Sequence, residues 1–291
     1  MAVYTLTNTH LNIKVNSWGA ELCSVISNDL AIEYIWQADP AVWGRHAPHL
    51  FPIVGKLKEG TYRFQEKVYQ LPQHGFARDM DFTCIEATTD TLCFELTSNE
   101  DTLKQFPFKF NFRITYTLQE TKLTTHYSVS NSGSNTMYFS VGAHPAFNCP
   151  LQSHEAFEHY ELQFPGCEAL VINKLDNGLI TSATEVVSTP HGVLGLSPSL
   201  FEKDALVFKN TQVEYVKLLS KETGHGVSLS SLQWPYFGIW TKPSTSGFIC
   251  LEPWYGIADA TTAGGKFEDK EGVICLEPST QFSASFELGF F

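Results

Sequence analysis

The sequence has few charged residues and no cluster of positive charge. Charged side chains make up 17% of the 291 residues, and Asp plus Glu outnumber Lys plus Arg by 31 to 19, giving a formal net charge of −12 at pH 7. Proteins that follow a phosphate backbone need grouped Lys and Arg, so we expect no nucleic-acid partner. No apolar run approaches membrane-spanning length, and residues 1–20 carry neither a basic start nor an unbroken apolar segment. We therefore expect no membrane partner and a cytoplasmic location.

Signatures of nucleotide binding, serine hydrolysis and metal binding are also missing. No G-x-G-x-x-G follows a strand pattern, and neither G-x-x-x-x-G-K-[ST] nor G-x-S-x-G occurs. The seven Cys form no C-x-x-C pair, which indicates buried, reduced thiols. "HEAFEH" (154–159) is one residue too long for the H-E-x-x-H zinc motif, and we interpret "RHAPHL" (45–50) in the same way. Both are typical of solvated loops, so we expect no metal.

Apolar and aromatic residues are plentiful, and they follow the period of β-strands. Hydrophobic residues make up 43% of the chain, which argues against disorder. "FKFNFRITYTLQ" (108–119) alternates strictly between apolar and polar residues and predicts a long strand with one buried face. "KLTTHYSVSN" (122–131) and "MYFSVGAH" (137–144) follow across turn residues. Together the three segments predict a meander of antiparallel strands.

The same alternation recurs along the rest of the chain, separated by Gly, Pro, Asn and Ser. Helix signals are short and few: residues after Asp39-Pro40, after Asn99 and after Ser197-Pro198. This pattern predicts an all-β protein built as a large antiparallel sandwich or barrel. Because no long linker or low-complexity segment occurs, we expect residues 1–291 to form a single domain.

The pentapeptide "ICLEP" occurs twice, at 249–253 and at 274–278, and the sequences that follow differ at once. The repeat is therefore not an internal duplication. In the first copy Glu252 ends an apolar strand and precedes Trp254 and Tyr255, where partial desolvation can tune a carboxylate as a base. Glu277 leads into a Pro-Ser-Thr turn, as an ordinary solvated strand-end carboxylate does. We expect Glu252 to be functional and Glu277 to be structural.

Two histidines stand in loops of the kind that form pockets. His74 lies in "LPQHGFARDMDF", and His144 lies in "SVGAHPAFNCP", each among Gly, Pro and aromatic residues. A lone His is most often structural. An imidazole paired with a carboxylate, however, is the usual equipment for moving protons near neutral pH, and aromatic surfaces suit the C–H faces of sugars.

The motifs "HGFARD", "GAHPAFN" and "LEPWYGIAD", taken together and in this order, resemble those of the aldose 1-epimerase (galactose mutarotase) family, in its LacX-like branch. The similarity extends from "EYIWQADPAVWGRHAPHLFPIVGKLKEGTY" to "DKEGVICLEPSTQF", which is most of the chain. The resemblance implies a large antiparallel β-supersandwich and an isomerase that needs no cofactor. It also implies a small-molecule sugar as partner, and it leaves a monomer or a homodimer open.

The resemblance also implies roles for particular residues. Glu252 corresponds to the catalytic base of the family and His144 to its acid. His74 resembles the second pocket histidine, which hydrogen-bonds the sugar ring region. Lys56 falls where galactose mutarotases carry a substrate-binding Arg, and Asp204 is similar in position to an Asp that binds sugar hydroxyls.

The form "HGFAR" is shared with hexose-6-phosphate 1-epimerases, so Arg78 leaves a phosphorylated sugar open as an alternative substrate. Phosphate favours paired Arg, and Arg78 with Lys56 are the candidates near these motifs. Trp254 or Trp234 is expected to form the pocket floor, and Asp79 or Asp81 to set the protonation of His74. In the expected mechanism Glu252 takes the C1 hydroxyl proton and His144 protonates the ring oxygen, with a bell-shaped pH profile. A non-catalytic carbohydrate-binding sandwich is the alternative from another class.

Overall fold

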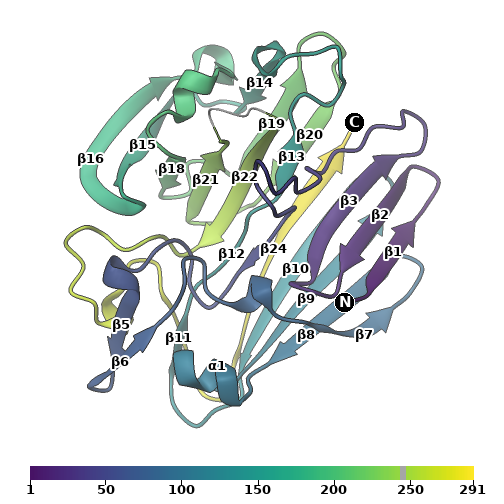
Figure 1. Cartoon of the computed structure of the whole chain (residues 1–291). Coiled ribbons are helices and arrows are strands. Elements are labelled where there is room, and N and C mark those ends of the chain that lie inside the picture. The colour runs from purple at the N-terminus through teal and green to yellow at the C-terminus, as the bar shows by residue number, and fades with distance from the viewer. Residues whose placement is uncertain (243–246) are drawn as a thin grey trace.

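The protein is built mainly from two large antiparallel sheets (Figure 1). The computed structural model describes residues 1–242 and 247–291. Nine strands form one sheet, in the spatial order β17 (Val193–Gly195), β14 (Tyr160–Gln163), β19 (Tyr215–Ser220), β20 (Gly226–Ser230), β24 (Gln281–Phe290), β10 (Lys122–Asn131), β9 (Phe110–Gln119), β8 (Thr91–Thr97) and β7 (Thr83–Ala87). Eight form the other, in the order β16 (Leu179–Ser188), β15 (Ala169–Asp176), β18 (Leu206–Lys209), β21 (Tyr236–Trp240), β22 (Phe248–Tyr255), β12 (Val141–Ala143) and β4 (His49–Leu50), with β13 (Ala146–Asn148) also paired to β22. The predicted all-β class is confirmed.

Smaller elements complete the fold. The short sheets are β1 (Val3–Thr7), β2 (Leu11–Asn16) and β3 (Glu21–Ser27); β5 (Thr61–Phe64) with β6 (Lys67–Gln70); and β11 (Met137–Phe139) with β23 (Ile274–Leu276). Single turns of 3₁₀-helix occur at η1 (Lys58–Gly60), η2 (Ala77–Asp79), η3 (Phe157–His159), η4 (Pro190–Gly192), η5 (Pro198–Phe201) and η7 (Phe267–Asp269). No helix in the described part of the chain has the length and apolarity needed to cross a membrane.

The short helix predicted after Asn99 is present as α1 (Glu100–Gln105). The Asn99 side chain accepts hydrogen bonds from the backbone N–H groups of Asp101 and Thr102, and the Thr102 hydroxyl accepts one from the Asn99 N–H. This reciprocal cap satisfies N–H groups that a helix start leaves free. The segment after Ser197 forms only η5, and the residues after Pro40 form turns instead of the predicted helix.

The first two strands of the predicted meander are confirmed as β9 and β10. They pair antiparallel, with Gln119 opposite Lys122 at the turn and Phe110 opposite Asn131 at the other end. The third strand of the meander was predicted wrongly. Residues 137–144 pair instead with β23, β22 and β4. The physical reason is that the edge of β10 that does not pair with β9 pairs with the C-terminal strand β24. The chain after β10 therefore crosses into the eight-stranded sheet and carries His144 with it.

Strand β22 is buried on both faces, and its two faces belong to different parts of the core. Ile249 and Leu251 pack in the main core, whereas Cys250 and Trp254 pack in two smaller clusters on the opposite face. Alternate side chains of a strand point to opposite faces, so Cys250, Glu252 and Trp254 share the second face. This arrangement explains why the sequence "FICL" (248–251) is a continuous apolar run without alternation.

The two histidine motifs interpreted as solvated loops are both more buried than expected. His49 is in the core, where its two ring nitrogens lie 2.6 Å from the hydroxyls of Tyr127 and Tyr116. Tyr127 also donates to the carbonyl of Gly142 on β12, so this network supports the strand that leads to His144. In the other motif, Glu155 is buried and accepts hydrogen bonds from the hydroxyls of Tyr160, Ser220 and Thr223. Buried His and Glu persist here because these polar partners satisfy them.

All seven cysteines are free thiols, as expected, but only three of them are buried, namely Cys93, Cys149 and Cys250. The other four are more accessible, and Cys275 in the second "ICLEP" is exposed. The prediction of uniformly buried thiols is therefore wrong. The prediction treated every Cys as a small hydrophobe, although Cys275, in the middle of the short strand β23, points to solvent.

Candidate active site

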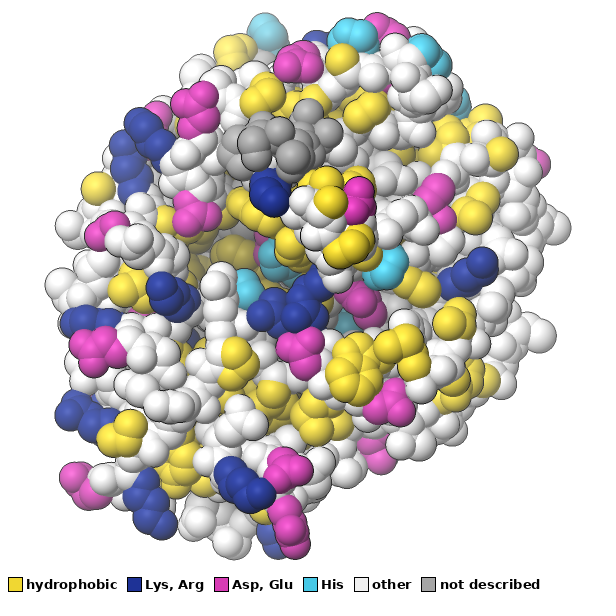
Figure 2. All heavy atoms as spheres, in the orientation of Figure 1, with side chains coloured by type: hydrophobic (Ala, Val, Ile, Leu, Met, Phe, Trp, Pro, Cys, Tyr) yellow, Lys and Arg dark blue, Asp and Glu magenta, His cyan; other side chains and the backbone are white. Residues whose placement is uncertain are grey.

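A cavity of about 380 Å³ opens on the second face of β22. Figure 2 shows a hollow on this side of the molecule, in which histidine atoms are visible and beside which Lys or Arg side chains lie. Strands β15, β16, β18, β21 and β22 contribute residues to the cavity wall, and so do the loops after β4, β6 and β12. The polar side chains that line it are Arg45, Gln73, His74, Arg78, His144, Asp204 and Glu252, and three Trp side chains, Trp43, Trp240 and Trp254, supply aromatic walls.

Glu252 lies in the middle of β22, not at its end as the sequence suggested, since the strand continues to Tyr255. The residue is 2% exposed and pairs across the sheet with Gly238 of β21. Burial raises the pKa of the Glu252 carboxyl well above its usual range; the Trp254 indole lowers this pKa, and the negative charge of Asp204 raises it further. A desolvated carboxylate of this kind holds a proton strongly, as a general base near neutral pH must.

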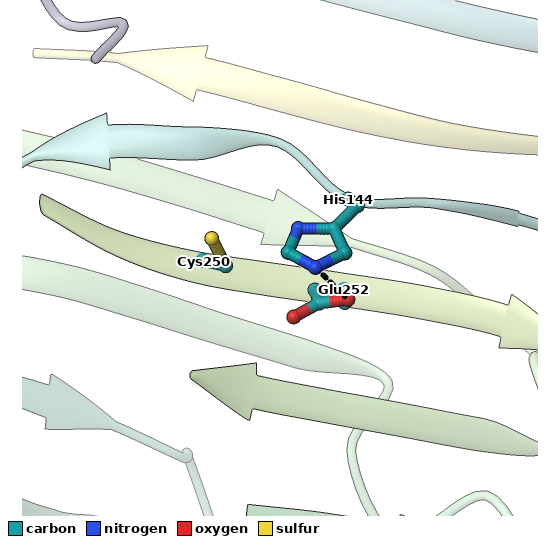
Figure 3. Close-up of side chains that lie close together, drawn as sticks. All are labelled: His144, Cys250 and Glu252. Atoms are coloured by element: carbon teal, nitrogen blue, oxygen red, sulfur yellow. Dashed lines mark ion pairs between the residues drawn. The ribbon is translucent and has the colours of Figure 1, made fainter. Parts of the chain in front are cut away.

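His144 follows the last residue of β12 and faces Glu252 (Figure 3). Its Nε2 lies 3.2 Å from Glu252 Oε2, yet that carboxylate oxygen has no aligned hydrogen-bond partner among the described residues. The imidazole stacks on Trp43, with ring centroids 5.0 Å apart. Burial lowers the pKa of His144 to about 3, with smaller contributions in the same direction from Arg78 and Arg45. The two groups are thus close enough to exchange a proton and are held apart from bulk water.

His74 stands edge-on to His144, with ring centroids 5.6 Å apart. Its Nδ1 accepts a hydrogen bond from the Gly55 N–H, at 3.2 Å. Burial lowers the pKa of His74 well below its usual range, and the neighbouring His144 and the two arginines add to this. Because Nδ1 is an acceptor, the neutral ring carries its proton on Nε2. His74 is therefore neutral, and its Nε2 lies 3.2 Å from the side-chain amide of Gln73, whose oxygen accepts from this Nε2–H when it faces the ring.

Arg45 and Arg78 both line the cavity and lie on either side of Asp79. Arg45 Nη2 is 3.0 Å from one carboxylate oxygen of Asp79, and Arg78 Nε is 3.8 Å from the other. Burial, together with the charge of Arg45, lowers the pKa of Arg78 to about 10, and the charge of Asp79 acts in the opposite direction. The two guanidinium groups and the Asp79 carboxylate together carry one net positive charge, and Asp204 at the cavity edge carries a negative one.

The Trp254 indole lies flat across two neighbouring strands because glycine occupies the facing positions. A Cβ on Gly238 of β21 would lie 2.3 Å from the far end of the indole, and one on Gly142 of β12 would lie 2.7 Å from its near end. Any other residue at these positions would displace the ring. The sequence-based expectation of Trp254 as a floor residue agrees with its position in the cavity, whereas Trp234 is buried in the core and donates to the carbonyl of Ser285.

Not every residue predicted for the site lies in it. Lys56 is not among the cavity-lining residues, and its ammonium group donates instead to the backbone carbonyl of Asn177. Asp204 lines the cavity but is exposed at its edge. Glu277 is exposed in a turn after β23, as predicted.

The structure also revises the expected environment of His74. Asp79 contacts the two arginines, and Asp81 accepts a hydrogen bond from the Ser17 hydroxyl. The groups that act on the charge of His74 are therefore His144 and the two arginines, and neither Asp takes the role that the sequence suggested.

Four buried polar atoms of the cavity residues lack a hydrogen-bond partner within the described part of the chain. They are Arg78 Nε, His144 Nδ1, Glu252 Oε2 and Trp254 Nε1. Buried polar groups in native proteins are almost always satisfied, so a group of them around one cavity indicates a site shaped for a polar ligand. Donors and acceptors set among three Trp rings suit a molecule that is rich in hydroxyls and has apolar C–H faces.

Sequence reasoning missed Trp43, Arg45, Gln73 and Trp240. Trp43 and Arg45 lie in "AVWGRH", which was interpreted as a short helix, and Trp240 ends a segment that was interpreted only as a strand. Trp240 is two residues after Gly238, so the two share the cavity face of β21. The two-residue spacing of Gly238 and Trp240 is visible in the sequence. It identifies Trp240 as a cavity residue only when that face of β21 is known to line the cavity.

Among the residues that the structure describes, two groups of side chains have donor atoms close enough to hold a metal ion. His144, Cys250 and Glu252 form one inside the site, and His154, Glu155 and Glu222 form the other near η3. In each group the donor atoms lie within 4.8 Å of one another. A proton transfer between an acid and a base would involve only His144 and Glu252 of the first group, and it would leave Cys250 without a role.

The comparisons with known proteins identify the family of the chain. The chain matches the family model described as Aldose 1-epimerase over residues 2–279. The chain belongs to the aldose 1-epimerase family. The resemblance seen in its motifs is thereby confirmed, together with the enzyme class it implies, an isomerase of the mutarotase type.

Individual relatives match along the whole chain. Protein LacX (plasmid) from Lactococcus lactis subsp. lactis is 33% identical over 293 residues, covering 97% of each chain. The crystal structure of a galactose mutarotase related enzyme from Lactobacillus acidophilus matches with a TM-score of 0.95 and 37% identity, covering 100% of this chain and 97% of that one. A galactose mutarotase-like protein from Lactobacillus casei matches with a TM-score of 0.90 and 29% identity over 100% of both chains.

Proposed function

We propose that this protein is an aldose 1-epimerase that interconverts the α and β anomers of a hexose by opening and reclosing the sugar ring. The observation that carries the proposal is the contact of His144 Nε2 with Glu252 Oε2, 3.2 Å apart at the cavity. An acid and a base that are neighbours suit this reaction. The C1 hydroxyl and the ring oxygen of a hemiacetal are bonded to the same carbon, so one short pair can reach both.

In the proposed mechanism Glu252 accepts the proton of the C1 hydroxyl while His144 donates a proton to the ring oxygen. The bond from C1 to the ring oxygen breaks, and C1 becomes an aldehyde. Rotation about C1–C2 exposes the other face of the carbonyl, and the two proton transfers then run in reverse. Holding both groups at the hemiacetal replaces two encounters with water, which is the source of the acceleration.

The remaining cavity residues have proposed roles in binding. Trp43, Trp240 and Trp254 offer faces for the C–H groups of a sugar, and His74 offers its Nε2–H to an oxygen near the ring. Asp204 is placed to accept hydrogen bonds from sugar hydroxyls at the cavity edge. Lys56 would take part only if its ammonium group left the carbonyl of Asn177.

A phosphorylated hexose is the second candidate substrate, and the pairing of Arg45 with Arg78 favours it. The two guanidinium groups repel each other, and this repulsion is part of what lowers the pKa of Arg78. Asp79 already offsets one of the two positive charges, and a phosphate on the cavity side of the arginines would offset the other and accept several charge-assisted hydrogen bonds. From the sequence, Lys56 was the candidate for a second phosphate-binding cation beside Arg78. In the structure Arg45, and not Lys56, lines the cavity with Arg78.

One experiment tests the function and distinguishes these candidates. Anomer exchange is followed by proton NMR for glucose, galactose and their 6-phosphates, with wild-type protein and with Arg78→Ala. We expect faster exchange with at least one of these sugars. If phosphate esters are preferred, inorganic phosphate should compete with them, and Arg78→Ala should weaken both substrate and phosphate roughly tenfold or more. Binding of a sugar without acceleration of its exchange would show a carbohydrate-binding protein and contradict the proposal.

A further inference from the structure

Cys250 is a buried thiol beside the proposed catalytic pair, and the proton transfers described above do not use it. It lies two residues before Glu252 on β22, so both side chains leave the strand on the same face (Figure 3). Cys250 is 0% exposed and lies behind the residues that line the cavity. Its Sγ, a ring nitrogen of His144 and a carboxylate oxygen of Glu252 lie within 4.8 Å of one another.

This set of donors matches the ligands of soft divalent cations. Zinc binds thiolate, imidazole and carboxylate at about 2.0 to 2.3 Å, and three protein ligands leave a fourth position open to a water or a small molecule. With such bond lengths, ligands around a tetrahedral ion are roughly 3.5 Å apart. Atoms within 4.8 Å of one another therefore need shifts of about an ångström or less to enclose an ion.

Two further observations support a cation at this place. Glu252 Oε2 is buried and has no aligned hydrogen-bond partner in the described part of the chain, so a ligand bond would satisfy it. His144 and Glu252 line the cavity, which gives an ion a path from solvent. Arg45 and Arg78 at the same cavity repel cations in general, so binding would depend on the strong bond from sulfur to a soft metal.

We propose that His144, Cys250 and Glu252 form a site for a soft divalent cation such as Zn²⁺ or Cd²⁺, and that an ion bound there blocks the enzyme. On binding, the Cys250 thiol and the His144–Glu252 pair each release one proton to solvent, and bonds form from sulfur, nitrogen and oxygen to the metal; no electron is transferred. The ion occupies the lone pairs with which His144 and Glu252 would accept protons. The inhibition rests on the proposed function, whereas the binding does not.

Inhibition is tested by titrating Zn²⁺ into the anomer-exchange assay with wild type, Cys250→Ala and Cys275→Ala. Cys275 is the exposed counterpart of Cys250 in the second "ICLEP" and serves as the matched control. We expect the half-inhibitory concentration to rise at least tenfold in Cys250→Ala and to stay unchanged in Cys275→Ala, with EDTA restoring activity. Equal sensitivity of the three proteins, or no inhibition of wild type, would overturn the proposal.

Binding is measured without activity through the ultraviolet charge-transfer band of a Cd²⁺–thiolate bond. The measurement uses Cys275→Ala as background and adds Cys250→Ala or, should that variant fold poorly, Cys250→Ser. We expect the band to fall when Cys250 is replaced and to persist in His154→Ala, which removes the second donor group. A band that does not depend on Cys250 would overturn the site. A Cys250-dependent band in a protein with no epimerase activity would uphold the site while refuting the proposed function.

Discussion

The buried pair of His144 and Glu252 is best regarded as one unit that shares a single proton. Adding a second proton leaves an uncompensated imidazolium in a desolvated site, and burial lowers the pKa of His144 to about 3. Removing the shared proton leaves an uncompensated carboxylate, and burial raises the pKa of Glu252 well above its usual range. Both changes are costly, so the form with one proton persists over a wide range of pH.

We predict that kcat/KM has a broad plateau around neutral pH. The sign follows from the two shifts: the acid limb comes from protonation of the imidazole and lies below the usual pKa of His, near 6.5. The alkaline limb comes from loss of the shared proton and lies above the usual pKa of Glu. The check is a pH profile of kcat/KM from pH 4 to 10. A narrow bell with its acid limb near pH 6.5 would contradict the shared-proton description.

At the scale of elements, strand β22 carries both Glu252 and Trp254, and the flanking strands β21 and β12 leave room for the Trp254 indole. Gly238 of β21 and Gly142 of β12 let the indole lie across the sheet next to Glu252. The His49 network holds β12 from the opposite side, through the bond from Tyr127 to the Gly142 carbonyl. The orientation of the catalytic pair is thus set by main-chain positions on three adjacent strands.

Gly238→Ala tests this arrangement, because its new Cβ would lie 2.3 Å from the indole. We expect the ring to move by about an ångström and kcat/KM to fall roughly tenfold to a hundredfold, with a stability loss of about 1–3 kcal/mol. Gly264→Ala is the control, since a Cβ there meets no atom within 4 Å. Steady-state kinetics and urea unfolding give both quantities. Wild-type kinetics in Gly238→Ala would show that the position of the indole is unimportant.

Strands with one buried and one more exposed face could be predicted from the sequence. The extent of a strand that is buried on both faces could not. In β9, alternate residues are buried in the core while the others are half-buried or exposed, so its period was visible. Nearly every residue of β22 is buried, so its length and the central position of Glu252 were not visible. Arg45 and Arg78 are 33 positions apart, and only folding brings them to one carboxylate. Such a contact leaves no local pattern in a single sequence.

At the scale of the whole molecule, we propose that residues 1–291 form one domain. A single cluster of buried apolar residues runs from Leu6 to Phe290 and includes residues of both large sheets. The short N-terminal sheet contributes to the same cluster through Leu6, Ile13 and Val25. Segments from both ends of the chain therefore share one core, which favours cooperative unfolding.

We predict a single unfolding transition and a loss of stability in mild acid. Burial lowers the pKa of His49 to about 4, so between that value and its usual pKa of about 6.5 only the unfolded chain takes up the proton. Stability from this residue is present above pH 6.5 and is lost as pH falls towards 4, by about 3 kcal/mol in full. Urea unfolding at pH 7 and pH 5, with His49→Gln beside wild type, measures this. Two separate transitions would contradict one domain, and equal pH dependence in both proteins would contradict the role of His49.

The central claim is that Glu252 performs the proton transfer, and its counterpart in the second "ICLEP" provides the control. Polarimetry of a freshly dissolved single anomer compares wild type, Glu252→Gln and Glu277→Gln at equal enzyme concentration. Glu277 is exposed, so we expect Glu277→Gln to match wild type. Without a base, Glu252→Gln should lose roughly a hundredfold to ten-thousandfold in kcat. A Glu252→Gln protein that folds normally and retains the wild-type rate would contradict the mechanism.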